Sequence, residues 1–373
     1  MNSNQKIKNL MRLGWEEELH DIKAIKSINQ SIIEDIKEER ESSSITIHVI
    51  RHNDLDGIGV EVVFKLLSEL YGIEVKYYEE PTNADYSFKN IVENRTPYDF
   101  IFIGDISFSS REFIDNILDS HIDLKDYMIL LDHHRNVLWL NEYEFAYVKE
   151  HNIKDCIISS GSILTFLAFK NLLSSRLSNV QFSKLESLIN YIAAYDTYFF
   201  KDNDELCTSL YGNYPNMLNI LFKHNIKYKH SFIDNIFNRI LDNTTFELFG
   251  NIDFTVSNII AVQIDKLVDD AIDNCKIVSI DNRDVAIYYY SGEYNSEIGN
   301  GICSYYNNED NRIIDYCILV DMNKNKCSLR TSNDDIDLTE IIKHIPGSGG
   351  HKKAAGFSFT KDIKFENNSM ILN

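Results

Sequence analysis

The residues best suited to chemistry in this chain are imidazoles and carboxylates that stand where apolar runs stop. The segment "RHNDLDG" follows the run "SITIHVI" and places His52, Asp54 and Asp56 on alternate positions. Along an extended segment alternate side chains share one face, so these three groups could converge on one or two cations. Short Asp-rich turns after strands are also common, so this segment alone leaves both a metal site and a plain turn open.

Three further segments favour the metal site. Asp105 ends the run "DFIFIGD", Asp132, His133 and His134 end "DYMILLDHH", and Asp196 lies in "YIAAYDTYFF". Taken singly, Asp105 could be a turn former and Asp196 a polar residue on a mostly apolar helix. Together the four segments supply carboxylates and imidazoles with no thiolate beside them. That donor set suits a pair of hard divalent ions such as Mn²⁺ or Mg²⁺.

Apolar runs that end in Asp or His alternate with helical segments in the first half of the chain. The runs "SITIHVI", "DFIFIGD" and "DYMILLD" are typical of buried parallel strands, and "EVKYYEE" of a further short strand. Between the first two, "GVEVVFKLLSELYG" has helical periodicity with a glycine stop. The pattern predicts an α/β domain with a doubly wound, mostly parallel sheet, whose ligands lie beyond the carboxyl ends of the strands.

The remainder of the chain predicts a helical connector and a smaller α/β domain. Short strands are expected at "KIVSI", "VAIYYY", "DYCILVDM" and "KCSLRTS", and helices at "NSEIGNGICSYY" and "DLTEIIKHI". The segment "PGSGGHKKAAGFSF" reads as a glycine-rich loop that leads into a final strand. We therefore expect an N-terminal helical extension at 1–43, a catalytic domain at 44–200, a helical connector at 201–274 and a substrate-binding domain at 275–373.

The composition limits the partners. There are 37 Lys and Arg against 57 Asp and Glu, a formal net charge of -20, and such a chain lacks the basic footprint that a long nucleic-acid duplex requires. An anionic substrate remains compatible if metal ions and a few local cations reverse the sign at one pocket. The six cysteines form no CxxC pair and no apolar window reaches the length of a membrane span. We expect free thiols, no membrane partner and a cytoplasmic location.

Four motifs carry a resemblance to a known family. "HNDLDGIG", "LDHHRN", "AAYDTYFF" and "GSGGHKKAAGFSF" occur in the order found in the DHH phosphoesterase superfamily with its DHH-associated C-terminal domain. The chain resembles this superfamily over roughly residues 45–360, and within it is most similar to the oligoribonuclease (nanoRNase) B group. The resemblance implies an active site in the cleft between the two domains, and frequent homodimers in such families imply a homodimer here.

The resemblance also implies a role for each matching residue. It assigns His52, Asp54 and Asp105 to one metal ion, and Asp56, Asp105, His133 and Asp196 to a second. Mn²⁺ is the expected metal and Mg²⁺ the alternative. It implies catalytic roles for His134, Asp132, Arg330 and His351, and substrate binding by Arg330, Gly349, Gly350, His351 and Asn300. Asp132 would orient a neighbouring imidazole and His134 would face the phosphate.

The function implied is hydrolysis of short single-stranded RNA to nucleoside 5'-monophosphates, through activation of water by two metal ions. A second hypothesis is hydrolysis of a small nucleotide, either phosphoadenosine phosphate or a cyclic nucleotide or dinucleotide. A third, of another class, is a nucleotide-binding regulator without catalysis. The orientation of Arg51 is open at this point, since it could meet a phosphate or pair with a surface carboxylate.

Overall fold

The structure is a computed structural model that describes residues 25–26, 28–30, 46–96, 99–150, 159–197, 211–308, 311–345, 348–359, 363–366 and 369–372. The chain divides into two compact units, Met1–Phe254 and Thr255–Asn373. Nearly all of the predicted N-terminal extension, 1–43, lies outside the described residues. Among the described helices, none has the length and apolar character that a membrane span needs.

The first unit is built on a sheet of five parallel strands in the order β2-β1-β3-β4-β5. The strands are β1 (Thr46–His52), β2 (Glu74–Glu80), β3 (Phe100–Gly104), β4 (Met128–Asp132) and β5 (Ala146–Val148). Every residue of β3 and β4 is buried, as expected for continuous apolar runs in a parallel sheet. This confirms the predicted sheet, except that the three-residue β5 was too short to be recognised in the sequence.

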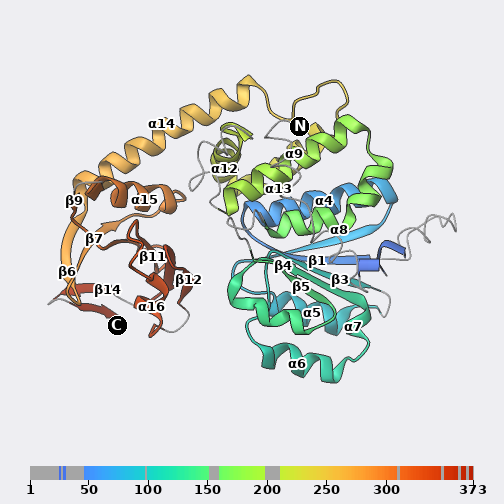
Figure 1. Ribbon diagram of the computed structural model, residues 1–373, viewed down its shortest axis with the longest axis horizontal. Coiled ribbons are helices and arrows are strands. Elements are labelled where there is room, and N and C mark those ends of the chain that lie inside the picture. The colour runs from blue at the N-terminus through green and yellow to red at the C-terminus, as the bar shows by residue number, and fades with distance from the viewer. Residues whose placement is uncertain are drawn as a thin grey trace, which may run out of the picture. The chain divides into compact units, whose positions relative to one another are not determined.

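Helices cover both faces of this sheet (Figure 1). One face carries α4 (Leu55–Tyr71), α8 (Gly161–Arg176), α9 (Asn179–Asp196) and α13 (Lys229–Leu241), with α12 (Tyr214–His224) against α9. The other carries α5 (Asp85–Asn94), α6 (Arg111–Ser120) and α7 (Leu124–Tyr127). Two short 3-10 helices also belong to this unit, η1 (Arg135–Glu142) and η2 (Ile226–Tyr228).

The order of the strands determines where a ligand can bind. The chain proceeds outward from β1 to β2 and then returns past β1 to β3, so the direction of winding reverses between β1 and β3. Crevices at such a switch point, outside the carboxyl ends of the strands, are the usual ligand sites of doubly wound sheets. β1 ends at His52, β3 is followed by Asp105, and β4 ends at Asp132.

The second unit contains a six-stranded sheet in the order β12-β13-β11-β10-β7-β6. Its strands are β6 (Lys276–Ile280), β7 (Arg283–Tyr289), β10 (Tyr316–Asp321), β11 (Lys326–Arg330), β12 (Gly349–His351) and β13 (Ala354–Ser358). β7 and β10 are parallel and the other pairs are antiparallel. α15 (Asn295–Tyr306) contacts β10 and β11, and α16 (Leu338–Ile342) contacts β12 and β13. α14 (Asn251–Asn274) contains the boundary between the units.

The C-terminal region corrects one prediction. The glycine-rich segment was expected to be a loop, yet Gly349–His351 forms the edge strand β12 against β13. Gly350 has φ 137°, and a Cβ there would lie 2.4 Å from the carbonyl oxygen of Ala354, so only glycine permits this close pairing. The strand that follows, β13, was expected to be the final one. It is not, because β14 (Ile363–Glu366) and β15 (Ser369–Leu372) form a further pair. A second small pair consists of β8 (Asn307–Asn308) and β9 (Asn311–Arg312).

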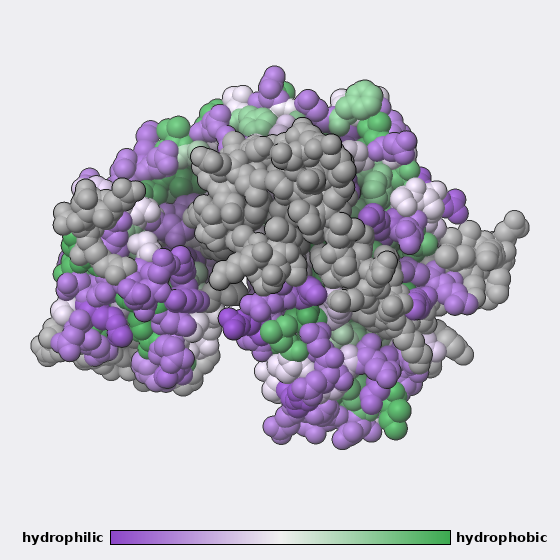
Figure 2. Space-filling model, viewed as in Figure 1, coloured by the Kyte–Doolittle hydropathy of each residue, from purple (hydrophilic) through white to green (hydrophobic). Residues whose placement is uncertain are grey.

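Hydrophilic residues cover most of the described surface on the face shown in Figure 2, and hydrophobic ones are scattered between them. The exposed hydrophobic residues include Tyr86, Phe246 and Ile252. This is the solvated surface that the acidic composition predicts.

Gly57 provides a test of the turn between β1 and α4. A Cβ on Gly57 would lie 2.1 Å from the carbonyl oxygen of His52, so Gly57→Ala forces the strand end and the helix apart. We expect a loss of roughly 2–3 kcal/mol in the free energy of unfolding, measured by urea denaturation. Gly72→Ala is the control, since Gly72 has φ 68° in open space and should cost only about 1 kcal/mol. Equal losses for the two variants would contradict the packing argument.

Candidate metal centre

The segment after β1 does not stay extended. The expected alternation of His52, Asp54 and Asp56 along one extended face is therefore not found. The strand stops at His52, Asp54 is the N-cap of α4, and Asp56 lies in the first helical turn. Asp54 Oδ1 accepts the amide proton of Gly57 at 3.1 Å, a favourable cap that starts the helix immediately. As a result Asp56 turns away from His52 and Asp54 and joins a different group of side chains.

The first group of potential ligands consists of His52, Asp54 and Asp105. His52 Nδ1 lies 2.7 Å from Asp54 Oδ2 and 3.9 Å from Asp105 Oδ2. One donor atom from each residue lies within 4.8 Å of the others, so a single cation could contact all three.

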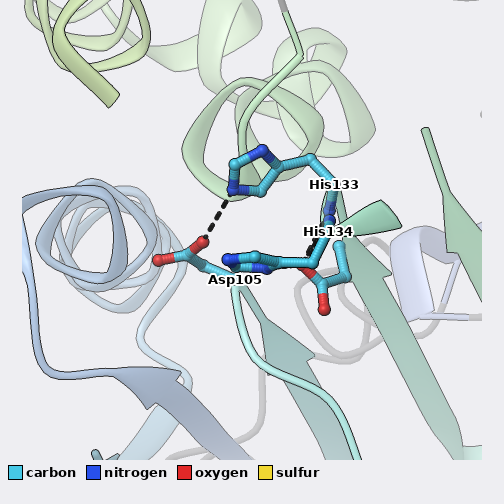
Figure 3. A group of neighbouring side chains, drawn as sticks. Asp105, His133 and His134 are labelled. Atoms are coloured by element: carbon cyan, nitrogen blue, oxygen red, sulfur yellow. Dashed lines mark hydrogen bonds and ion pairs between the residues drawn. The ribbon is translucent and has the colours of Figure 1, made fainter. Parts of the chain in front are cut away.

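The second group consists of Asp56, His133 and Asp196, with Asp105 again close by. His133 Nε2 lies 3.3 Å from Asp105 Oδ1, 3.3 Å from Asp196 Oδ2 and 4.0 Å from Asp56 Oδ2. Figure 3 shows the His133 ring directed toward the Asp105 carboxylate. Asp105 therefore stands between the two groups.

Asp132 contacts the second imidazole of the DHH triplet. Its Oδ1 lies 2.7 Å from His134 Nδ1 and accepts the backbone amide of His133 at 2.6 Å, while Ser107 Oγ donates to Oδ2. Asp132 thus accepts hydrogen bonds at both carboxylate oxygens and fixes the orientation of His134. Asp105, Asp132, His133 and His134 also form a group of their own by donor distance.

The backbone of Asp105 has an unusual conformation. Its φ is 61°, in the left-handed region that costs most residues energy, and its amide is anchored by a 3.0 Å hydrogen bond to the carbonyl of Leu131. Gly161 packs against it, because a Cβ on Gly161 would lie 2.3 Å from the Asp105 Cβ. The backbone at this strand end is held in place to direct one carboxylate into the centre.

Asp56 is supported by the N-terminus of α8. Its carboxylate accepts the amide of Gly161 at 2.6 Å, the amide of Ser162 at 3.2 Å and the hydroxyl of Ser160 at 2.8 Å, and the Ser162 hydroxyl donates to it as well. Helix N-termini favour negative charge, so this arrangement stabilises the buried carboxylate anion. Each carboxylate oxygen has two lone pairs, so Oδ2 retains capacity to bind a cation.

Asp105 and Asp196 have no such compensation. Burial raises the pKa of both Asp105 and Asp196 well above the ordinary value, and the charges of Asp56 and Asp54 raise each further. Asp196 is also the last residue of α9, where the helix dipole is unfavourable to an anion. Burial, and then the neighbouring His134, lowers the pKa of His133 to about 4, which favours the neutral, metal-binding imidazole.

The orphaned atoms show that the residues fit divalent ions. Within the described residues, Asp105 Oδ2, His133 Nε2 and Asp196 Oδ2 are buried without a hydrogen-bond partner. Buried polar atoms normally have partners, and a cluster of orphaned ligand atoms such as this one suits a bound cation. None of the candidate donor groups in the described part of the chain contains a cysteine, in keeping with a hard cation.

The second unit contains Arg330, which was predicted to bind substrate and which ends β11. Its Nη2 donates to Ser296 Oγ at 2.8 Å and its Nη1 to the carbonyl of Leu329 at 2.7 Å, whereas Nε is buried without a hydrogen-bond partner among the described residues. Gly299 in α15 lets the side chain pass, since a Cβ there would lie 2.7 Å from Arg330 Cγ. Two of its contacts fix the guanidinium, and the Nε–H stays without a hydrogen-bond partner among the described residues.

The other predicted substrate residues of this unit lie on neighbouring elements. In the sheet, Ala354 of β13 pairs with both Arg330 and His351, and Gly350 and Gly349 precede His351 on β12. The side chain of His351 is outside the described part. Asn300 lies half-buried in α15, next to Gly299.

Several supporting residues were missed in the sequence. Ser160, Gly161 and Ser162 hold Asp56, and the "SSGS" segment at the start of a helix was a signal that could have identified them. Ser107 and Ser296 carried no recognisable signal. The open question about Arg51 is answered, because it is 2% exposed and donates from Nε to the buried Glu61 at 2.6 Å. It does not point toward the two ligand groups.

The chain is similar to known proteins over most of its length. Residues 282–370 match the DHHA1 domain. The chain is similar to the oligoribonuclease NrnB of Bacillus subtilis (strain 168), with 26% identity over 323 residues, covering 85% of this chain and 73% of NrnB. Both matches are of the kind expected for the DHH phosphoesterase superfamily, which the sequence motifs resemble. The predicted resemblance to this superfamily and to NrnB is thereby confirmed.

Solved structures are also similar to this chain. RecJ from Thermus thermophilus in complex with Mn²⁺ matches with a TM-score of 0.48 and 11% identity, covering 91% of this chain and 52% of RecJ. An exonuclease RecJ bound to manganese matches with a TM-score of 0.46 and 12% identity, covering 90% of this chain and 89% of that one.

Two aspartate-to-asparagine variants should change stability in opposite directions. In chelator, Asp105→Asn removes an uncompensated charge, and Asn tolerates the left-handed backbone, so we expect a gain of roughly 0.5–2 kcal/mol. Asp132→Asn disrupts a satisfied carboxylate whose pKa His134 and Ser107 hold below the ordinary value despite burial, so we expect a loss of roughly 1–3 kcal/mol.

The stabilities of the two variants should also respond differently to Mn²⁺. At 100 times the dissociation constant a bound ion stabilises the wild type by about 2.7 kcal/mol, and Asp105→Asn should lose most of this gain. Thermal denaturation with chelator and with Mn²⁺ measures both effects. An Asp105→Asn protein that is less stable than the wild type in chelator would contradict the charge argument.

Proposed function

We propose that this chain is a metal-dependent phosphodiesterase that hydrolyses short single-stranded RNA to nucleoside 5'-monophosphates. The observation that carries the proposal is the cluster of aspartate and histidine donors at the switch point of the sheet, three of whose buried atoms have no hydrogen-bond partner within the described residues. The similarity to an oligoribonuclease over 85% of the chain supports the class of substrate.

Two divalent ions fit the donor groups, with Mn²⁺ as our first choice and Mg²⁺ as the alternative. His52, Asp54 and Asp105 would hold one ion, and Asp56, Asp105, His133 and Asp196 the other. When bound, such a pair supplies a nucleophilic water at neutral pH and neutralises charge on the phosphate oxygens.

His134 is the proton donor in this proposal. Burial lowers its pKa, but the charge of Asp132 and their hydrogen bond outweigh that effect and raise the pKa of His134 to about 9. The imidazole is therefore protonated at neutral pH, with Nδ1–H held by Asp132 and a second N–H on Nε2. That second proton can be donated to a phosphate oxygen or to the leaving oxygen.

Residues of the DHHA1 domain would bind the substrate. The guanidinium of Arg330 has a buried Nε–H to offer to a phosphate oxygen, and Ser296 limits its movement. Backbone amides of Gly349 and Gly350, with His351 and Asn300, would complete the contacts to phosphate and sugar.

A substrate panel tests the proposed specificity. Purified protein with Mn²⁺ is incubated with a labelled RNA trimer, phosphoadenosine phosphate and cyclic dinucleotides, and initial rates are compared. We expect the trimer to be hydrolysed fastest, with release of 5'-monophosphates. Faster hydrolysis of a small nucleotide would overturn the RNA assignment, and binding without any hydrolysis would indicate a regulator.

His134→Gln tests the role of the proton donor. We expect kcat on the RNA trimer to fall roughly 10²–10⁴-fold, because a positioned general acid contributes about that much. Mn²⁺ binding should be retained, since His134 belongs to neither proposed ligand set. His121→Gln, at the end of α6, is the matched control and should keep full activity. An unchanged kcat for His134→Gln would rule out this role.

A further inference from the structure

Four charged residues lie beside the segment that follows β1. We call Arg51, Glu61, Glu79 and Lys229 the Arg51 network. Arg51 donates to Glu61 through Nε at 2.6 Å, and its Nη2 lies 3.4 Å from Glu79 Oε2. Lys229 Nζ lies 2.5 Å from Glu79 Oε1. Two cations and two carboxylates thus alternate in one connected group, which links β1, α4, β2 and α13.

Both cations of the Arg51 network also bind the backbone that carries the first ligand group. Arg51 Nη1 donates to the carbonyl of His52 at 2.9 Å, and Lys229 Nζ to the carbonyl of Asn53 at 3.4 Å. These two carbonyls belong to the peptide units between His52 and Asp54. The network therefore fixes the backbone between the two side chains that would hold the first ion.

The position of Lys229 argues against a role in the helix itself. It is the first residue of α13, where a cation is unfavourable because the helix dipole is positive at that end. Its side chain is only 17% exposed, and ordering and desolvating a lysine both cost free energy. The contacts that it gains lie on β2 and on Asn53, outside its own helix.

The extent of burial makes the geometry rigid. Arg51 is 2% and Glu61 5% exposed, so neither charge can exchange its partner for water. A buried ion pair is costly unless its partners stay in good geometry, and loss of one partner leaves the other uncompensated. The buried Arg51–Glu61 pair can therefore hold the carbonyl of His52 in one arrangement, and Lys229 adds the contact to the carbonyl of Asn53.

We infer that Lys229 and Arg51 are positioning residues that set the His52–Asp54 segment for the first metal ion. α13, which the sequence indicated only as part of a helical connector, thereby becomes part of the metal centre. The inference rests on the proposed function, because it takes His52 and Asp54 as ligands. It concerns the first ion only, since Asp56 and its ion are supported separately by α8.

Isothermal titration of chelator-treated protein with Mn²⁺ tests this inference without measuring activity. Asp54→Asn, which keeps a good N-cap, identifies the binding event of the first ion, and Asp196→Asn identifies that of the second. Lys229→Met should weaken the first event about 10-fold, as expected for residues that support metal ligands, and leave the second unchanged. Lys229→Arg should restore the wild-type affinity, and Glu79→Gln should weaken the same event as Lys229→Met.

Lys65→Met is the matched control. Lys65 of α4 pairs with Asp234 of α13, so this variant also removes an ion pair between those helices, but Lys65 makes no contact with the His52–Asp54 segment in the described structure. We expect it to bind both ions normally. Unchanged affinity in Lys229→Met, equal weakening of both events, or equal weakening in Lys65→Met would overturn the inference. A wild-type protein that binds no Mn²⁺ would instead contradict the proposed function itself.

Discussion

Repulsion among five aspartates at one edge of the parallel sheet is the constraint on which the first unit depends. Asp54, Asp56, Asp105, Asp132 and Asp196 converge where β1, β3 and β4 end. Asp56 and Asp132 are compensated by hydrogen bonds, whereas burial and neighbouring charge raise the pKa of Asp105 and Asp196. Protonation or a bound cation can compensate that remaining charge, so the same buried carboxylates that could bind metal ions are unfavourable as bare anions.

The two halves of the centre are supported by different parts of the chain. The N-terminus of α8 holds Asp56 and packs Gly161 against the strained Asp105, while the Arg51 network holds the backbone of the His52–Asp54 segment. Asp132 performs a third task, since it orients His134 without joining either proposed ligand set. In the proposed two-ion arrangement, separate supports would allow one ion site to be weakened without the other, and this is why variants of Lys229 are informative.

The sequence could predict the sheet and the candidate donors because both depend on local patterns. Apolar runs ending in Asp or His place those side chains at one edge of a parallel sheet, whatever the detailed packing. It could not predict that Asp54 would cap a helix, since an alternating motif fits an extended segment equally well. The partners of Asp56 and Asn53 lie 104 and 176 residues away, and no periodicity encodes such contacts. β12 was missed because glycine carries no strand signal.

We propose that Asp105 is shared between two metal ions. A crystal structure with Mn²⁺, collected to give an anomalous difference map, tests it most directly. We predict two peaks about 3.5–4 Å apart, one among His52, Asp54 and Asp105 and the other among Asp56, Asp105, His133 and Asp196. A map with no peak at these residues, or with a single peak that does not touch Asp105, would contradict the account.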